Sequence, residues 1–300
     1  MPDNVPNWYQ QKWANRVIMR FQNRGIVLKG TSEEPVKIEG DKFHFLRSDK
    51  MEAQPYARGD SITPINPDDD TVEMQSAEWD APYALYDIDD TKLPVRVQDT
   101  RQMQATAALG RRADRIIYDA VMNATLPGGH VFGDYANPFD PYVFKTGLEK
   151  LIDADVDGVG EGTGVYAPLP SLAYAQLETY KIYANSQWVG GDLPLTKMVK
   201  HKTWDIANCF LLPPHLRKAY TSTDELRFRV WHKSAIGAGH NQAIRTEWTR
   251  EGLKKRWVVN HTIDGVAVPL QPAGIIEFRM KADSAIMAEI DKAMVIEVEE

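Results

Sequence analysis

The longest helical pattern in the chain covers residues 99–126, which read DTRQMQATAALGRRADRIIYDAVMNATL. Apolar side chains recur there at helical spacing and fall near one face: Met103, Ala107, Ile117, Val121 and Ala124. Three arginines, Arg111, Arg112 and Arg115, lie on the same stretch. The spacing predicts a long, rigid helix over 99–125 that carries outward charges and holds no catalytic constellation.

The sequence at both ends of this helix matches patterns that start or stop a helix. Asp99 followed by Gln102 matches a capping box, in which the carboxylate accepts hydrogen bonds from first-turn amides and the glutamine reaches back. Pro127-Gly128-Gly129 predicts where the helix stops. Gly110 costs up to about 1 kcal/mol relative to alanine inside a helix, which predicts a close packing approach at that position.

A second amphipathic helix is predicted over 8–24, with Gly25 at the position after its last turn. Apolar residues recur at every fourth position from Tyr9 to Phe21. A cationic stripe runs beside them at the same spacing: Lys12, Arg16, Arg20 and Arg24. This stripe is either a solvated helix face or a positive strip that docks on an acidic partner surface.

Two shorter helices are predicted further along the chain. Asp140-Pro141 supplies an N-cap followed by proline at the first helical position, and it opens a helix that runs through Ile152. A strand-like start at Val165–Ala167 precedes a helix from Ser171, which indicates a compact lobe of mixed α and β structure.

Strand patterns dominate elsewhere. Residues 36–47 alternate around Gly40-Asp41, and residues 225–231 alternate apolar positions with arginines, as a half-buried strand does. The chain from 243 to 280 is almost entirely strand-like, and Asp264-Gly265 predicts a hairpin turn within it. The final residues AMVIEVEE predict one more strand.

Residues 52–90 form an acidic, turn-rich excursion, with eleven acidic residues against the single base Arg58. The flanks ARGDSITPI and TVEMQSAEWDAPYALYDI could pair as an extended hairpin. Such an arm is too polar to bury much surface on its parent domain. We therefore expect either a floppy segment or one supported by another molecule.

Composition and charge restrict the classes of function that this protein can have. A chain of 300 residues usually divides into two or more lobes, and a formal net charge of −7 argues against a surface that coats nucleic acid. Cys209 is the single cysteine, so an intrachain disulfide is excluded, and its apolar surroundings predict an inert buried thiol. No signal peptide or membrane-spanning window is present in the sequence, so we expect a soluble protein made in a reducing cytoplasm.

Motifs for catalysis are weak. Asp153, Asp155, Asp157 and Gly158 match the first half of a calcium loop, but Gly164 stands where its bidentate glutamate belongs, so a solvated acidic turn is favoured. The seven histidines share no metal-ligand spacing, and LKKRW at 253–257 is best explained as a cationic strand edge. The sequence predicts no catalytic, cofactor or metal residues. Paired carboxylates still leave a glycosidase-like site open.

The order of these parts resembles the major capsid proteins of tailed bacteriophages, which have the Hong Kong 97-type fold. The stretches that carry the resemblance are YDIDDTKLPVRVQDTRQMQATAALGRRADRIIYDAV, VWHKSAIGAGHNQAIRTEW and GIIEFRM. The resemblance covers nearly the whole chain and rests on arrangement, because no diagnostic short motif is present. It implies an α+β fold, no enzymatic activity and no cofactor.

The resemblance also implies a division of the chain into four parts. Residues 1–38 would form an N-arm and 39–95 an extended β-hairpin loop. Residues 96–140 and 242–282 would form a peripheral domain around the spine helix 99–125. Residues 141–241 and 283–300 would form an axial domain at the centre of each capsomer.

A shell protein of this family assembles with itself into hexamers and pentamers that enclose double-stranded DNA non-specifically. The chain begins directly with the arm, which implies a separate scaffolding protein, and a portal and decoration or cement proteins are further expected partners. No membrane is expected, and the protein would reside in the virion after assembly in the host cytoplasm. The candidate intersubunit contacts are the cationic stripe, the acidic excursion and the spine arginines: Lys12, Arg16, Arg20, Arg24, Asp68, Asp69, Asp70, Glu73, Glu78, Arg111, Arg112 and Arg115.

Two alternatives to a phage capsid stay open at this point. The aromatic residues and paired carboxylates are compatible with a carbohydrate-active or carbohydrate-binding enzyme of small oligomeric state. A nanocompartment shell that holds protein cargo would use the same fold and differ only in its contents.

Overall fold

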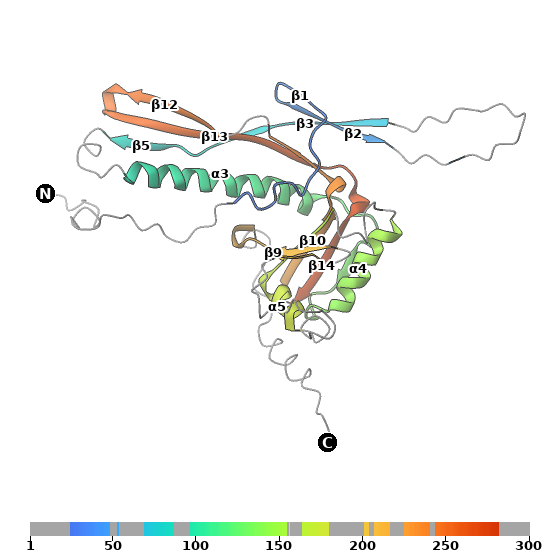
Figure 1. Cartoon of the computed structure of the whole chain (residues 1–300). Helices are drawn as coiled ribbons and strands as arrows, with labels where there is room; N and C mark the ends of the chain where they lie inside the picture. The colour runs from blue at the N-terminus through green and yellow to red at the C-terminus, as the bar shows by residue number, and fades with distance from the viewer. Residues whose placement is uncertain are drawn as a thin grey trace, which may run out of the picture. The chain divides into compact units, whose positions relative to one another are not determined.

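The structure is a computed structural model, and it describes residues 25–48, 53, 69–86, 96–154, 156, 164–179, 201–203, 207–216, 225–240 and 244–281. The chain divides into two compact units. Unit 1 comprises Met1–Ile26, Glu78–Ala113 and Gln242–Asp264, and unit 2 comprises Val27–Ala77, Asp114–Asn241 and Gly265–Glu300. The described elements form an α+β fold (Figure 1).

The centre of unit 2 is a six-stranded sheet with the order β6-β14-β10-β7-β9-β8. Its strands are β6 (Val131–Gly133), β7 (Val165–Leu169), β8 (His201–Thr203), β9 (Asn208–Leu211), β10 (Glu225–His232) and β14 (Ile275–Lys281). The longest pairing is antiparallel, between β10 and β14, and it brings Phe228 opposite Phe278. Residues from both strands are buried almost continuously, because this pair lies inside the sheet and not at its edge.

Helix α4 (Pro141–Asp153) packs on β14 and β6 of this sheet, and α5 (Ser171–Thr179) packs on β7 and β9. The N-cap of α4 is Asp140, whose side chain accepts a hydrogen bond from the Tyr142 amide at 2.8 Å, as the sequence predicts. Phe144 and Leu148 of α4 are buried in a core cluster together with Phe228 and Phe278. Cys209 is buried in the same cluster, so the predicted buried thiol is confirmed.

The strand predicted around Gly40-Asp41 is a hairpin of β1 (Lys37–Glu39) and β2 (Lys42–Ser48), and Gly40 adopts the positive φ of its turn. Strand β2 also pairs antiparallel with β3 (Asp69–Gln75). The predicted pairing of 57–65 with 71–88 stays a prediction, because residues 54–68 lie outside the described part of the chain. On the edge that the structure describes, the partner of β3 is β2, whose Phe43 and Phe45 provide an apolar face.

Within unit 1, β12 (Arg245–Glu251) and β5 (Tyr83–Tyr86) pair with opposite edges of β13 (Arg256–Pro269), and β4 (Ala77–Asp80) also pairs with β13. The β12–β13 hairpin turns through the short helix η2 (Gly252–Lys254) and a left-handed Lys255. Within unit 2, the last residues of β13 pair with β11 (Ile236–Gly239). Two further 3₁₀ turns are η1 (Lys233–Ala235) and η3 (Pro272–Gly274).

The hairpin turn predicted at Asp264-Gly265 is wrong, since both residues lie inside the continuous strand β13. The glycine serves a close approach instead. A Cβ atom at Gly265 would lie 2.5 Å from Nδ1 of His240, closer than real Cβ atoms come. A glycine in a strand marks either a turn or such an approach, and the sequence alone does not distinguish them.

The predicted long helix is confirmed as α3 (Arg96–Asn123), whose 28 residues extend about 42 Å. It begins three residues before Asp99, so the predicted capping box is wrong, because Asp99 already lies in the helix. The predicted close approach at Gly110 is confirmed within unit 1. A Cβ atom at Gly25 would lie 2.1 Å from the Gly110 carbonyl carbon, and the Ile26 amide donates to the Gly110 oxygen at 3.3 Å.

Several sequence predictions fall outside the described residues: the helix 8–24, the loop residues 49–52 and 54–68, most of the acidic turn 153–164 and the strand at 293–300. Gly25, predicted to follow the first helix, has the left-handed φ of 76° that such a position favours. Among the described helices, none combines the length and the apolar character that crossing a membrane requires.

Candidate functional site

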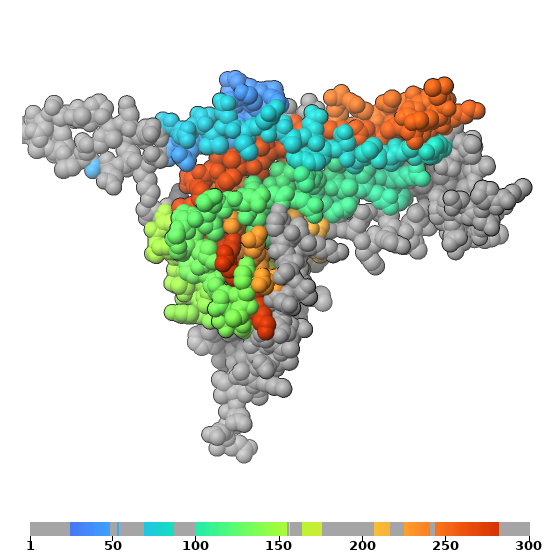
Figure 2. Space-filling model, turned by 180° about the vertical axis from the view of Figure 1, so that it is seen from behind, coloured from blue at the N-terminus to red at the C-terminus, as the bar shows by residue number. Residues whose placement is uncertain are grey.

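The acidic residues predicted to contact other subunits are concentrated on β3. Asp69, Asp70 and Glu73 are all exposed there, and β3 pairs only with β2 among the described strands. Its other edge therefore presents backbone groups that no described strand satisfies. In the space-filling view, β3 lies at the surface (Figure 2).

Strand β2 supports β3 from its own chain. Phe43 and Phe45 are fully buried against Val266, Val268 and Leu270, with the half-buried Val72 of β3 beside them. The opposite face of the β2–β3 pair is polar and exposed, and it includes Leu46, which is 61% exposed. The base of the excursion is thus fixed to unit 2, while most side chains of β3 remain available for a partner.

Side chains of β2 lie opposite the carboxylates of β3. Arg47 lies opposite Asp70 with 3.4 Å between Nη2 and Oδ2, and Nδ1 of His44 lies 3.3 Å from Oε1 of Glu73. These groups are exposed, apart from the mostly covered His44, and such surface pairs each contribute at most about 1 kcal/mol. Asp68 lies outside the described residues, so its predicted role is not placed.

Glu78, the remaining acidic candidate, lies on β4 in unit 1 and is exposed. The spine arginines Arg112 and Arg115 make contacts within their own chain. The Arg112 guanidinium lies 4.5 Å from the ring centre of Trp79, a cation–π contact in unit 1, and Arg115 donates to the His215 carbonyl oxygen at 3.5 Å in unit 2. Arg111 is half-buried. The cationic stripe Lys12, Arg16, Arg20 and Arg24 lies outside the described residues.

Strand β12 is an exposed surface that sequence reasoning did not single out. It pairs only with β13 among the described strands, and six of its seven residues are exposed on both faces. Trp248 is 57% exposed on this strand, and Leu253 at the following turn is fully exposed. Exposed edge strands with large apolar side chains are typical of surfaces that another chain covers. The sequence signal for this surface was Trp248, a large apolar residue among the polar residues of the strand-like stretch AIRTEWTR.

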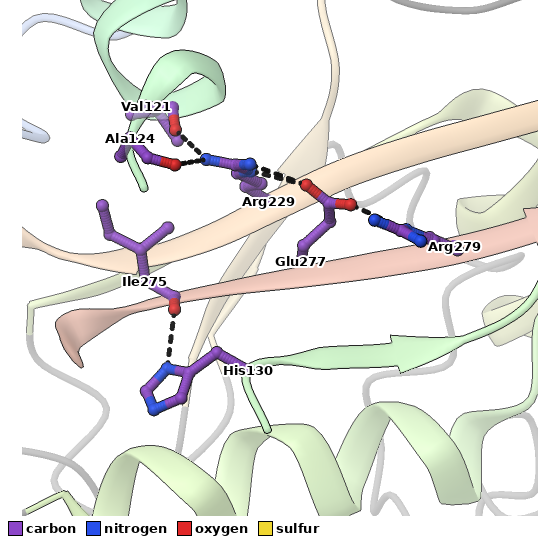
Figure 3. A network of polar contacts seen from close by, with 7 residues as sticks. All are labelled: Val121, Ala124, His130, Arg229, Ile275, Glu277 and Arg279. Carbon is purple, nitrogen blue, oxygen red and sulfur yellow. Dashed lines mark hydrogen bonds and ion pairs between the residues drawn. The ribbon is translucent and has the colours of Figure 1, made fainter. Parts of the chain in front are cut away.

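A buried charge network lies where the end of α3 meets the six-stranded sheet in unit 2 (Figure 3). Arg229 donates from Nη1 to the carbonyl oxygens of Val121 and Ala124, at 2.7 and 2.8 Å. Its Nε and Nη2 atoms lie 2.9 and 2.8 Å from Oε2 of Glu277, and Arg279 donates to Oε1 at 2.8 Å. The strand predicted for 225–231 is present, but the expected exposure of its arginines is wrong at Arg229, which points into the core and caps α3.

A buried histidine, His130, takes part in two further hydrogen bonds in this region. Nδ1 of His130 donates to the Ile275 carbonyl oxygen at 3.0 Å, and the Glu277 amide donates to the His130 oxygen at 2.9 Å. These bonds align β6 with β14 (Figure 3). Sequence reasoning missed both residues, since a lone arginine and a lone histidine in strand-like stretches most often lie at the surface.

The ionisation of Glu277 predicts a pH dependence of stability. Burial alone would raise the pKa of Glu277, but hydrogen bonds from Arg279 and Arg229 and their charges hold it below its ordinary value of 4.5. A lowered folded-state pKa stabilises the protein above pH 4.5, and this contribution is lost as the pH falls through the folded pKa. We expect the difference in unfolding free energy between wild type and Glu277→Gln to shrink below about pH 4.5. Urea unfolding at pH 7, 5 and 3.5 measures it, and a constant difference would contradict the assignment.

A cavity of about 250 Å³ lies between β6, α4 and β14, with Phe139, Phe278 and Met280 in its apolar wall and Asp134 and Asp140 at its polar side. Both carboxylates have structural roles. Asp134 accepts hydrogen bonds from the amides of Ala136 and Asn137 at 2.9 Å, and Asp140 caps α4. In the described part of the chain, no cluster of three metal-ligating side chains is present.

Comparisons of the sequence and of the fold with known proteins find matches among phage capsid proteins. Residues 5–141 match the family model described as phage capsid protein. The capsid of the cyanophage P-SCSP1u is 15% identical with a TM-score of 0.68, covering 89% of this chain and 91% of its own. The corresponding values are 16%, 0.65, 93% and 98% for Mycobacterium phage Che8, and 12%, 0.65, 95% and 98% for the capsid of Ralstonia phage GP4.

No curated protein matches the sequence. The structural matches are too distant in sequence to show more than the fold, but they extend over nearly the whole length of each relative. The family match covers residues 5–141, which include α3 and end at the first residue of α4. The chain is thus similar to phage capsid proteins in the sequence of residues 5–141, and it shares their fold.

Proposed function

We propose that this capsid protein is the major subunit of an icosahedral shell, assembled as hexamers and pentamers, that encloses double-stranded phage DNA. The observation that carries the proposal is the pair of exposed edge strands, β3 and β12, on a chain with the phage capsid fold. Each strand has one edge that no described strand pairs with, and exposed side chains that a monomer would leave in water. Neighbouring copies would cover them in a shell.

The parts take the roles of a Hong Kong 97-type subunit. Residues 1–38 act as the N-arm, 39–95 as the extended loop, and 96–140 with 242–282 as the peripheral domain around α3. Residues 141–241 and 283–300 act as the axial domain. The pairing of β4 and β5 with β13 suggests that the end of the loop region supports the peripheral domain of its own chain.

The acidic excursion would extend over neighbouring subunits, where the arm bases Lys12, Arg16, Arg20 and Arg24 are candidate partners. Exposed ion pairs contribute only about 0–1 kcal/mol each, so shell stability would come from many weak contacts repeated by symmetry. A separate scaffolding protein would guide assembly in the host cytoplasm, a portal would occupy one vertex, and decoration proteins could bind outside. The shell would have no enzymatic role.

Expression of the chain alone and together with the scaffolding protein tests this function. Size-exclusion chromatography and negative-stain microscopy are expected to show capsomers or closed shells of uniform curvature. Nuclease-resistant DNA in particles from infected cells would support a phage capsid, and protein cargo without DNA would instead support a nanocompartment. A discrete small oligomer under every condition would contradict the proposal.

A further inference from the structure

Strand β12 has an edge that can accept another strand. Its seven residues pair without interruption with β13 on one side, and no strand of the described chain pairs with the other side. Natural proteins protect such edges with lysine, proline, a bulge or a covering segment. The sequence of β12, RTEWTRE, contains no lysine or proline, and its register with β13 contains no bulge. A further strand can therefore extend the sheet of unit 1 at this edge.

The charges of β12 alternate in sign and balance. Arg245 and Arg250 stand against Glu247 and Glu251, so the strand has no net charge of its own. Nη2 of Arg245 lies 2.6 Å from Oε1 of Glu247, and Nε of Arg256 on β13 lies 2.9 Å from Oε2 of Glu251. Because a balanced strand does not repel an identical strand, a second copy of β12 is an acceptable partner.

Twofold symmetry limits the registers in which two copies of β12 can pair. When a twofold axis relates antiparallel neighbours, it stands perpendicular to the sheet, and opposite residues project from the same face. The axis then passes through a pair of residues with the same number. Only axes at Glu247, Trp248 or Thr249 pair at least five of the seven positions of the strand.

Charge selects one of these three registers. An axis at Glu247 places this carboxylate opposite its own copy, and an axis at Thr249 places Glu247 opposite Glu251. Like charges directly opposite each other are destabilising. An axis at Trp248 pairs all seven positions, places Arg245 opposite Glu251 and leaves no like charges opposite each other.

The same register also covers the exposed aromatic side chain of the strand. Trp248 is 57% exposed in the single chain and would lie directly opposite its own copy. Opposite residues of an antiparallel pair have Cβ atoms about 4.5–5.5 Å apart, so the two indole rings can pack on each other. Charge balance and apolar burial therefore favour the same axis.

We propose that β12 pairs antiparallel with β12 of a neighbouring copy across a twofold axis at Trp248, so that the sheet of unit 1 continues from one subunit into the next. This inference rests on the proposed shell function, because an icosahedral shell contains twofold axes between subunits. It names the partner of the β12 edge and the register in which the two strands meet.

Cysteine substitutions in the full-length chain test the register, because the natural Cys209 is buried. Trp248→Cys places two thiols directly opposite each other. Thr246→Cys alone and Arg250→Cys alone each leave the two thiols about 14 Å apart along the strands, too far for a disulfide, which needs Cα atoms within about 7 Å. The double variant Thr246→Cys/Arg250→Cys brings unlike positions of the two copies together and retains Trp248.

Shells of each variant are oxidised mildly, and disulfide-linked dimers are measured on non-reducing gels. We expect at least about tenfold more linked dimer in Trp248→Cys and in the double variant than in either single control, since only the first two satisfy disulfide geometry. The double variant carries the test alone if Trp248→Cys does not assemble.

A charge reversal tests the contact without cysteine. Arg245→Glu places a carboxylate opposite Glu251 of the neighbouring copy, so the yield of closed shells should fall severalfold. The matched control is Lys37→Glu on β1, which makes the same change of charge at an exposed base that also contacts a glutamate two positions later. This control should leave the yield unchanged.

Equal linkage in the single controls and in the two designed variants would overturn the register. Shells without linked dimer in any variant would overturn the strand contact, and an unchanged yield in Arg245→Glu would overturn the selection by charge. If the wild-type chain forms no shells at all, the proposed function fails. Oxidation of the same variants as unassembled chains at high concentration then decides separately on the strand contact.

Discussion

Replacement of Arg229 by alanine is expected to lower the free energy of unfolding by about 3–5 kcal/mol, because it leaves a buried carboxylate without its main partner. Glu277 is 2% exposed, and Arg279 reaches only its other oxygen. The carbonyl oxygens of Val121 and Ala124 would also lose their donor at the end of α3 (Figure 3). Urea unfolding of the unassembled protein at pH 7 measures the loss.

Two comparison variants separate charge from packing. Arg227→Ala changes a half-buried arginine two residues away on β10 and should cost less than about 1 kcal/mol. The double variant Arg229→Met with Glu277→Leu removes both charges and should recover part of the loss, since paired replacement of buried ions by apolar groups is well tolerated. Equal losses in Arg229→Ala and Arg227→Ala would contradict the proposed cap on the spine helix.

Removal of residues 49–68, which include the first part of the acidic excursion, is expected to abolish shell formation and to leave the subunit folded. Ser48 and Asp69 lie directly opposite each other at the end of the β2–β3 pair. Residues 49–68 can therefore be replaced by Asn-Gly, which closes a two-residue hairpin turn. The buried side chains of Phe43 and Phe45 are retained, so the thermal midpoint should change by less than about 4 °C, the shift that 1 kcal/mol produces in a chain of this size.

A control for loop length keeps residues 49–68 but scrambles their order. If the particular sequence contacts a neighbour, the scrambled chain should also fail to form closed shells on gradients and in negative stain. Normal shells from the Asn-Gly variant would show that the excursion is dispensable. Loss of the folded subunit would show that the excursion packs on its own chain.

Sequence patterns correctly predicted the elements that depend on residues close together in the chain. The helix α3, the Asp140 cap of α4, the turn at Gly40 and the buried Cys209 all follow from residues within one turn or one strand. Gly110 was informative as well, since its cost inside a helix indicated the approach of Gly25.

The sequence did not predict contacts between residues that are far apart in the chain. Gly265 looked like a turn because its close neighbour, His240, is 25 positions away in the chain. Arg229 looked exposed because Glu277 and the end of α3 are remote in sequence. The capping box failed because helical structure continues before Asp99, where no local signal requires a start. The exposed strand β12 was missed since its solvent exposure depends on which strands pair with β13.

The most direct measurement is hydrogen exchange in closed shells compared with unassembled subunits. We predict that the peptides covering β3 (69–75) and β12 (245–251) become protected on assembly, because neighbouring copies cover the edges that no described strand pairs with. The peptide covering β10 (225–232), buried within its own unit, should exchange equally slowly in both states. Equally fast exchange of β3 and β12 in shells and in free subunits would contradict the account.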